Sequence, residues 1–138
     1  MTKERLRAYQ KNKQEREQLR QQLEEIEAAL YYPKIQRLTA MPSAPVDGNP
    51  QEDLAIRHIE LQERYRAKLD ELAGEQLAIE QAIESLEQTQ RLLMRYRYLE
   101  GLKWETICCK INYGWTQTHH IHGEALKALR RYEESLRE

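Results

Sequence analysis

The residues best suited to chemistry lie near the C-terminal end of the chain. A closely spaced polar and aromatic group is found there: Trp115, Thr116, Gln117, His119 and His120. Glutamine can pair with adenine through two hydrogen bonds, and threonine or tryptophan can contact a thymine methyl group. Five basic residues lie around this group and could bind phosphate oxygens: Lys103, Lys110, Lys127, Arg130 and Arg131. These side chains indicate base reading and phosphate binding on double-stranded DNA.

Two helices are predicted to position these side chains. Gly101 is expected to end a preceding helix, because glycine tolerates the left-handed backbone conformation. A short helix over residues 103–111 would place four apolar side chains on one face: Trp104, Ile107, Cys108 and Ile111. Residues 112–114, Asn-Tyr-Gly, favour a tight turn, and a second helix follows over residues 115–136. Two helices joined by a short glycine-containing turn, the second longer and more basic, are typical of a helix-turn-helix.

A helical wheel separates two faces of the second helix. The face centred on Thr118 is apolar and should pack against the rest of the domain: Ile121, His122, Ala125, Leu126 and Leu129. The opposite face should be free to bind: Thr116, His120, Gly123, Lys127, Arg130 and Arg131. The N-terminal end of such a helix usually enters the major groove, so Trp115 and Gln117 are expected there.

Other kinds of chemistry find little support. Cys108 and Cys109 are adjacent, so on a helix their side chains point about 100° apart, and no CxxC pair exists to start a zinc site with the nearby histidines. The sequence holds no glycine-rich phosphate loop and no GxSxG motif. We therefore expect no catalytic residues, no metal, no cofactor and no small-molecule substrate. Two vicinal cysteines are consistent with a reducing compartment.

The rest of the chain is predicted to form long helices, so the predicted fold is all-α. Three of the four prolines fall between residues 38 and 50, and after them apolar residues alternate at spacings of four and three, as in a coiled coil. These seam positions are expected to mediate self-association: Tyr65, Leu69, Leu72, Gln76, Ile79, Ile83, Leu86, Gln90 and Leu93. The predicted division is an N-terminal helix (1–37), a proline-containing loop (38–50), a long coiled-coil helix (51–100) and a helix-turn-helix DNA-binding domain (101–138).

The long helix needs a partner for its apolar stripe. At 1.5 Å per residue, a helix over residues 51–100 would be about 75 Å long, too long to be stable without one. We expect the N-terminal helix to fold back as a hairpin over part of this stripe and a second copy of the chain to cover the rest, which predicts a homodimer. Gln76 and Gln90 would then fix the register by pairing, or lie exposed at a splayed end.

The net charge of −1 hides opposite signs in different regions. Residues 1–40 carry a net +3, residues 41–90 a net −7 and residues 91–138 a net +3. A basic run near the N-terminus is interpreted as the solvated face of a helix: Arg5, Arg7, Lys11, Lys13, Arg16 and Arg20. The acidic middle should lie away from DNA and serve for dimerisation or for contact with RNA polymerase. In 138 residues no apolar stretch is long enough for a membrane span or a secretory signal, which predicts no membrane association and a cytoplasmic location.

Three stretches carry a resemblance to a known family: residues 97–107 (RYLEGLKWETI), Tyr113, and residues 121–126 (IHGEAL). They resemble a phage and prophage protein family of formally unknown function. Its C-terminal half is similar to region four of bacterial sigma factors and to late-gene transcription activators of the RinA and ArpU type. The resemblance implies a DNA-binding activator in the cytoplasm or nucleoid of a bacterial host. The chain departs from the family pattern at Cys108, usually Ala, at Thr118, usually branched and apolar, and at His119 and His120, often Arg or Tyr.

Two other functions remain open. A phage small terminase subunit also combines a helix-turn-helix with a helical oligomerisation hairpin, although its DNA-binding unit typically comes first. A protein-interaction module that contacts RNA polymerase without reading DNA is the second alternative, because region four of sigma factors also meets proteins. The small excess of positive charge in residues 91–138 leaves this possibility open.

Overall fold

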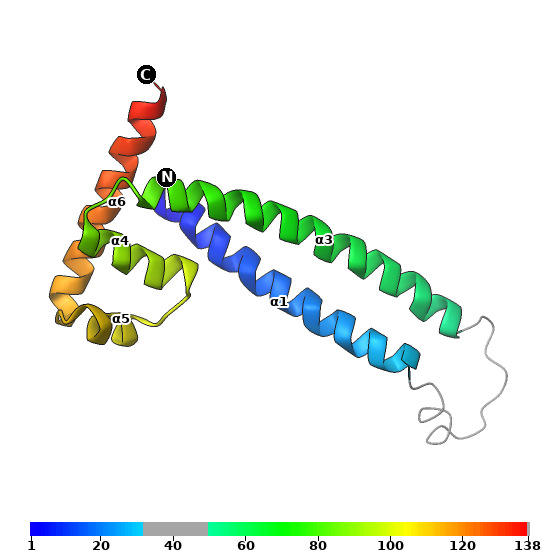
Figure 1. Ribbon diagram of the computed structural model, residues 1–138. Helices are drawn as coiled ribbons and strands as arrows, with labels where there is room; N and C mark the ends of the chain where they lie inside the picture. The colour runs from blue at the N-terminus through cyan, green and yellow to red at the C-terminus, as the bar shows by residue number, and fades with distance from the viewer. Residues whose placement is uncertain (32–49, 138) are drawn as a thin grey trace. The chain divides into compact units, whose positions relative to one another are not determined.

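The computed structural model describes residues 1–31 and 50–137, and in these ranges the chain is entirely helical (Figure 1). Five α-helices and one π-helical turn follow one another: α1 (Lys3–Tyr31), α3 (Pro50–Ile83), α4 (Gln88–Met94), η1 (Arg95–Leu99), α5 (Trp104–Ile111) and α6 (Trp115–Arg137). The all-α prediction is confirmed, with no strand in the described ranges. Pro50, expected in the loop, begins α3, where its fixed φ suits a first helical position. The rest of the predicted loop, and residues 32–37 of the predicted first helix, lie outside the described residues.

The described residues form two compact units. Gln14–Asp70 make up the first, called here the hairpin unit, in which the second part of α1 packs on the first part of α3. Met1–Lys13 and Glu71–Glu138 make up the second, called here the head unit. The head unit thus contains more than the predicted DNA-binding domain, because both ends of the chain and the end of α3 share its core.

The hairpin unit has a thin apolar seam. Leu19, Leu23 and Ile26 of α1 pack with Leu61 of α3, and Leu30 and Tyr65 lie partly buried beside them. Two ion pairs link the helices at the edges of this seam: His58 Nε2 lies 3.2 Å from Glu27, and Lys68 Nζ lies 3.0 Å from Glu15. The predicted hairpin is confirmed in this unit.

The head unit has a continuous core built from every one of its helices. Fully buried members come from α1 (Leu6), α3 (Ile79, Ile83), α4 (Leu93, Met94), α5 (Ile107) and α6 (Ala125, Leu129). Helices as short as α4 and α5 are marginal by themselves in water. Burial of these side chains, at about 25 cal/mol per Å² of apolar surface, is what stabilises them.

The prediction of one helix over residues 51–100 is wrong. The helix ends at Ile83, turns over residues 84–87, starts again as α4 and continues into η1. In the turn, Ser85 Oγ donates a hydrogen bond to the Ala82 carbonyl at 2.6 Å, and the amide of Leu86 donates one to the Ile83 carbonyl at 3.0 Å. Neither Gly nor Pro marks the break. Packing of α4 against α5 and α6 prevails over the local preference to continue the helix.

The break also changes the role of the predicted self-association seam. Five of its residues are buried inside the head unit of the same chain: Leu72, Ile79, Ile83, Leu86 and Leu93. They pack within the chain, and their burial needs no second copy. Leu69 and Gln76 remain exposed, Tyr65 is half-buried in the hairpin unit, and Gln90 is half-buried in α4. Gln76 donates a hydrogen bond to Glu80 at 3.3 Å, so the solvent-exposed alternative holds for it.

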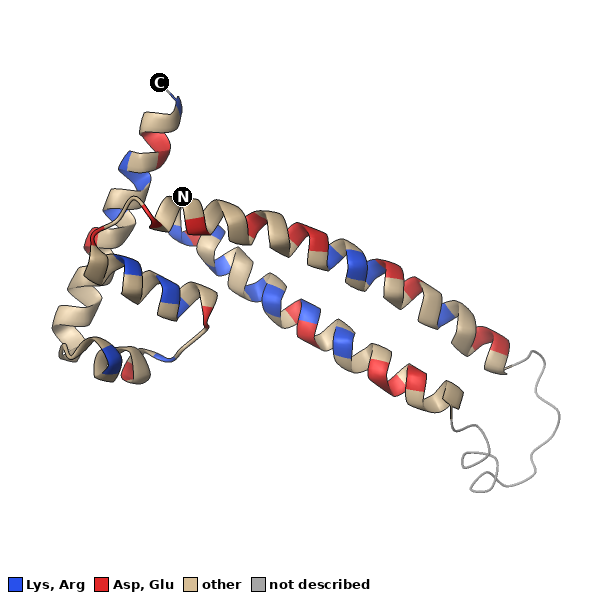
Figure 2. Ribbon diagram, in the orientation of Figure 1, with Lys and Arg blue, Asp and Glu red and all other residues tan. Residues whose placement is uncertain are grey.

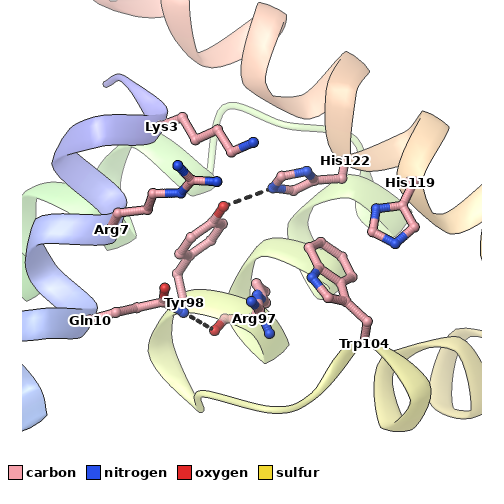
Figure 3. Close-up of a pocket in the computed structure, with 8 residues that line it drawn as sticks. All are labelled: Lys3, Arg7, Gln10, Arg97, Tyr98, Trp104, His119 and His122. Atoms are coloured by element: carbon pink, nitrogen blue, oxygen red, sulfur yellow. Dashed lines mark hydrogen bonds between the residues drawn. The ribbon is translucent and has the colours of Figure 1, made fainter.

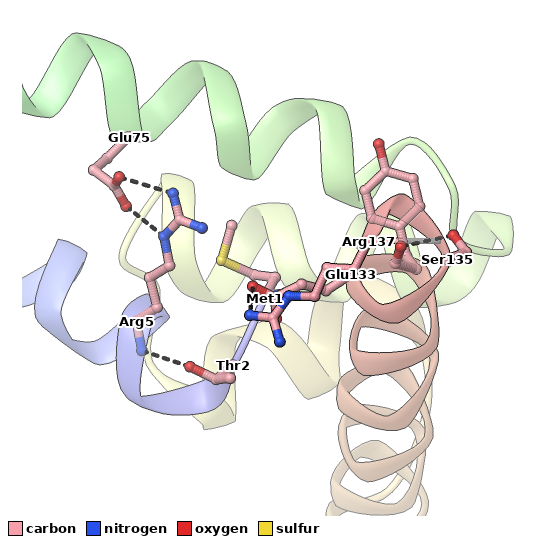
Figure 4. A network of polar contacts seen from close by, with 8 residues as sticks. Met1, Thr2, Arg5, Glu75, Glu133, Ser135 and Arg137 are labelled. Carbon is pink, nitrogen blue, oxygen red and sulfur yellow. Dashed lines mark hydrogen bonds and ion pairs between the residues drawn. The ribbon is translucent and has the colours of Figure 1, made fainter.

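Polar contacts link the start of α1 to α3 and α6 within the head unit (Figure 4). The Arg5 guanidinium donates two hydrogen bonds of 2.9 Å to the Glu75 carboxylate. The Met1 amino group lies against the carboxylate of Glu133, which Arg137 also approaches at 3.9 Å. These contacts join the first turns of α1 to helices far away in the sequence.

Candidate nucleic-acid interface

The turn between α5 and α6 forms where the sequence predicted it. Asn112 adopts the left-handed conformation with φ 61°, and Gly101, which precedes α5, does so with φ 72°. The amide of Tyr113 donates a hydrogen bond to the Cys108 carbonyl at 3.3 Å, and the amide of Thr118 donates one to the Gly114 carbonyl at 2.9 Å. Asparagine and glycine are the residues that adopt this conformation at least cost. The predicted bounds of both helices agree with the structure to within one residue.

The two faces of α6 are divided as the helical wheel predicted. Thr118, His122, Ala125 and Leu129 are buried, and Ile121 and Leu126 are half-buried. On the opposite face Gly123 is half-buried and the other predicted residues are exposed: Thr116, His120, Lys127, Arg130 and Arg131. Gln117, between the two faces, is also exposed. Trp115 begins the helix with 55% of its surface exposed, which is unusual for so large an apolar side chain. The side chains available for binding therefore start at the N-terminal end of α6.

The ring of His119 is half-buried in the structure. It lies between two tryptophans, with centroid distances of 4.5 Å to Trp104 and 4.5 Å to Trp115. Its Nε2 is buried and has no hydrogen-bond partner among the described residues. Base reading by His119 stays a prediction, and it would have to use the other ring nitrogen. The contact with His119 also positions the exposed Trp115.

The predicted phosphate-binding residues are all exposed. Lys103 stands at the start of α5, and Lys110 at its end, with Nζ 5.3 Å from the centroid of the Tyr96 ring. Lys127 makes only a loose contact of 3.5 Å with Glu124. Arg130 and Arg131 are exposed and form no ion pair with any described residue. Figure 2 shows basic segments along α6. Cations without a partner of their own are free to neutralise phosphates.

A buried pair of polar side chains joins η1 to the packing face of α6. The Tyr98 hydroxyl and His122 Nε2 are 2.8 Å apart, and both side chains are almost fully buried. Burial, together with the positive charge of Lys3 and other nearby cations, lowers the pKa of His122 to about 4. His122 is therefore neutral at physiological pH, which is consistent with its predicted place on the packing face.

Sequence reasoning missed the contribution of α1 and η1 to this region. The Gln10 amide donates a hydrogen bond to the Arg97 carbonyl at 2.8 Å, and Lys13 Nζ donates one to the Leu99 carbonyl at 2.5 Å. A π-helical turn leaves carbonyl groups that the regular helical pattern would satisfy. The guanidinium of Arg97 lies 4.7 Å from the centroid of the Trp104 ring. No local sequence pattern predicts contacts between residues that are nearly ninety positions apart.

Other site types receive no support in the described ranges. Within them, no group of three or more His, Cys, Asp or Glu side chains is arranged to hold a metal ion. Cys108, predicted on the apolar face of α5, is half-buried, Cys109 is exposed, and both are free thiols. None of the helices in this part of the chain has the length and apolar character needed to cross a membrane.

The chain matches no protein-family model, no curated protein and no solved structure. The resemblance to phage transcription activators therefore stays a hypothesis that rests on the residues quoted above.

Proposed function

We propose that the chain is a sequence-specific DNA-binding transcription regulator of the phage late-gene activator type, in which α5 and α6 form a helix-turn-helix. One observation carries the proposal. α6 is buried on one face by the head core, and on the other it exposes Trp115, Thr116 and Gln117 at its N-terminal end, followed by unpaired arginines. A helix anchored on one side with polar readers at its N-terminal end suits entry into the major groove.

Within this proposal the exposed residues have different tasks. Gln117 pairs with adenine, His120 contacts a base edge, and Thr116 and Trp115 contact thymine methyl groups. The basic residues bind phosphates and fix the docking of α6 without reading sequence: Lys103, Lys110, Lys127, Arg130 and Arg131. The two tasks predict different consequences of mutation, since loss of a reader changes which sequence is bound, and loss of a phosphate contact weakens binding to every sequence.

Self-association and polymerase contact are proposed for the exposed acidic surface of α3. Most of the predicted seam is buried within the chain, so a homodimer would have to use what remains exposed, including Leu69 and Gln76. RNA polymerase is the other proposed partner for this surface. Sedimentation equilibrium of the full chain tests the dimer, because it gives the solution mass directly.

The experiment for base reading is a selection of duplex DNA sites from a random pool, followed by affinity measurements on the selected site. Substituting Gln117→Ala should cost about 1–3 kcal/mol on the selected site and relax selection at one position. Gln62→Ala is the matched control, because Gln62 is an exposed glutamine of α3 in the hairpin unit. Equal effects of the two substitutions would contradict base reading by α6.

Two alternative functions predict other results. A small terminase subunit would form a ring of eight or more copies in solution and bind DNA through that assembly. A polymerase-binding module would show no site selection, and its affinity for duplex DNA would not depend on salt. The mass measurement and the selection separate all three functions.

A further inference from the structure

A cavity with a basic lining opens in the head unit beside the Tyr98–His122 pair (Figure 3). Its volume is about 240 Å³, enough for several water molecules or a small ligand. Four elements line it: α1 (Lys3, Arg7, Gln10), η1 (Arg97, Tyr98), α5 (Trp104) and α6 (His119, His122). We call it the basic cavity.

The walls of the basic cavity are held in place by contacts that do not depend on a ligand. Arg97 Nη1 donates a hydrogen bond to the Leu102 carbonyl at 3.1 Å, and its guanidinium lies over the Trp104 ring. The Tyr98 and His122 side chains, only 2% and 6% exposed, contribute polar atoms to the lining. η1 is a π-helical turn, a feature that often occurs at functional sites. One side of the cavity is thus formed by polar side chains that contacts within the chain hold in place.

The charged side chains that line the basic cavity are all positive. Lys3, Arg7 and Arg97 line it, and no acidic side chain is among its described lining residues. None of these three cations forms an ion pair with a carboxylate in the described part of the chain, whereas nearby Arg5 is bound to Glu75. Like charges kept close together without a counter-ion are unfavourable. The low pKa of His122, to which Lys3, Arg97 and Arg7 contribute after burial, reports the same positive potential.

We propose that the basic cavity binds a phosphate group, held by Lys3, Arg7 and Arg97. A guanidinium matches the spacing of two phosphate oxygens and can bind them in bidentate fashion, whereas an ammonium acts as a point charge. Three cations suit the charge of a phosphate monoester or pyrophosphate better than that of a single carboxylate. The group could come from two sources, a small phosphorylated ligand or the backbone of bound DNA. Lys3, Arg7 and Arg97 are not among the base-reading or phosphate-binding residues proposed above.

The test is a pyrophosphate titration of the full chain at constant ionic strength, followed by the NMR signals of the Trp104 indole and the Tyr98 and His122 rings. The wild type should show saturable shifts confined to the cavity. Lys3→Gln combined with Arg7→Gln should weaken binding by about tenfold or more, since two charge-assisted contacts are lost. Both side chains are exposed on α1, so the double variant should keep its fold.

A matched control removes two charges elsewhere. Lys11 is an exposed residue of α1 that does not line the cavity, and Arg66 is exposed on α3. Lys11→Gln combined with Arg66→Gln should leave the pyrophosphate affinity unchanged. Absence of saturable shifts in the wild type, or an equal loss in this control, would overturn the proposal.

Duplex DNA in the same titration identifies the source of the phosphate. If the cavity holds a backbone phosphate, DNA will displace pyrophosphate, and the Lys3→Gln/Arg7→Gln variant will bind DNA with a weaker salt dependence. If it holds a small ligand, pyrophosphate will remain bound in the presence of DNA and the salt dependence will not change. Either result supports the phosphate site.

Discussion

The head and hairpin units both have an apolar core, but the two cores differ in size and in how deeply their residues are buried. Among the described residues, the head core joins fourteen buried apolar residues from all of its helices, and many of them are fully inaccessible. The described part of the hairpin core has four, none of them fully buried. The head unit, to which all six elements contribute, is thus the more tightly packed, and the hairpin unit, made of two long helices alone, has the thinner core. Tertiary burial, rather than helix length, decides where the chain is stable enough to hold a binding surface in place.

The largest expected effect comes from substitutions that create a cavity in the core of each unit. Ile107→Ala removes a fully buried side chain of α5 in the head unit and should cost about 2–5 kcal/mol of unfolding free energy. Leu61→Ala in the hairpin unit should cost less, because a thin seam can close over the gap. Urea denaturation followed by circular dichroism, with amide hydrogen exchange to assign each unit, measures both. A greater loss from Leu61→Ala would contradict the comparison.

The next effect is a pH dependence that should be confined to the head unit. The pKa of His122 is lowered from 6.5 to about 4 in the folded chain. The unfolded state therefore takes up a proton at a higher pH than the folded state does. The head unit should lose stability as the pH falls from about 6.5 toward 4 and should gain nothing above that window.

Thermal unfolding at a series of pH values measures this effect. His122→Asn should flatten the dependence in that window while lowering stability at neutral pH, because the bond to Tyr98 is changed. His120→Gln, at an exposed position of the same helix, is the control and should leave the profile intact. A profile that is unchanged in His122→Asn would exclude His122 as its origin.

A smaller effect concerns an unsatisfied hydroxyl in the head core. Thr118 is fully buried, and its Oγ1 has no hydrogen-bond partner among the described residues. Valine has nearly the same shape and no hydroxyl to desolvate. Thr118→Val should stabilise the head unit by about 1 kcal/mol, measured as an increase in Tm. A decrease in Tm would show that the hydroxyl is satisfied by a group such as a bound water.

The smallest effect is expected from the surface of the head unit. The Arg5–Glu75 pair has good geometry, but 42% and 32% of the two side chains are exposed. Exposed ion pairs typically contribute about 0–1 kcal/mol, so Glu75→Gln should have a small effect that disappears at high salt. A loss comparable to that of Ile107→Ala would mean that ion pairs, rather than the core, hold α1 in the head unit.

Local signals in the sequence were sufficient for α5, α6 and the turn between them. Gly101 and Asn112 adopt the backbone conformations that their residue types favour, and the wheel of α6 separated its faces correctly. The break at residues 84–87 could not be predicted, because no glycine or proline marks it and the apolar spacing continues through it. The burial of His119 Nε2 could not be predicted either, because Trp104, one of the two tryptophans beside it, lies on another helix.

The basic cavity was beyond the reach of sequence reasoning for a related reason. The sequence pattern predicted that Arg7 belongs to a solvated basic face of a helix. Only the fold brings it beside Arg97 and His122. Hydrophobic spacing predicts which face of a helix is buried, but it does not predict which distant helix covers that face. Sites assembled from both ends of a chain therefore need the structure.

The most direct test of the central claim, that the head unit binds duplex DNA through α6, is the salt dependence of DNA affinity. Each neutralised phosphate contributes a slope of roughly −0.9 in a plot of log affinity against log salt concentration. Arg130→Gln combined with Arg131→Gln should therefore reduce the magnitude of the slope by about 1.8. Arg64→Gln combined with Arg66→Gln, two exposed arginines of the hairpin unit, should leave it unchanged. A wild-type slope near zero, or an equal change in both double variants, would contradict DNA binding by α6.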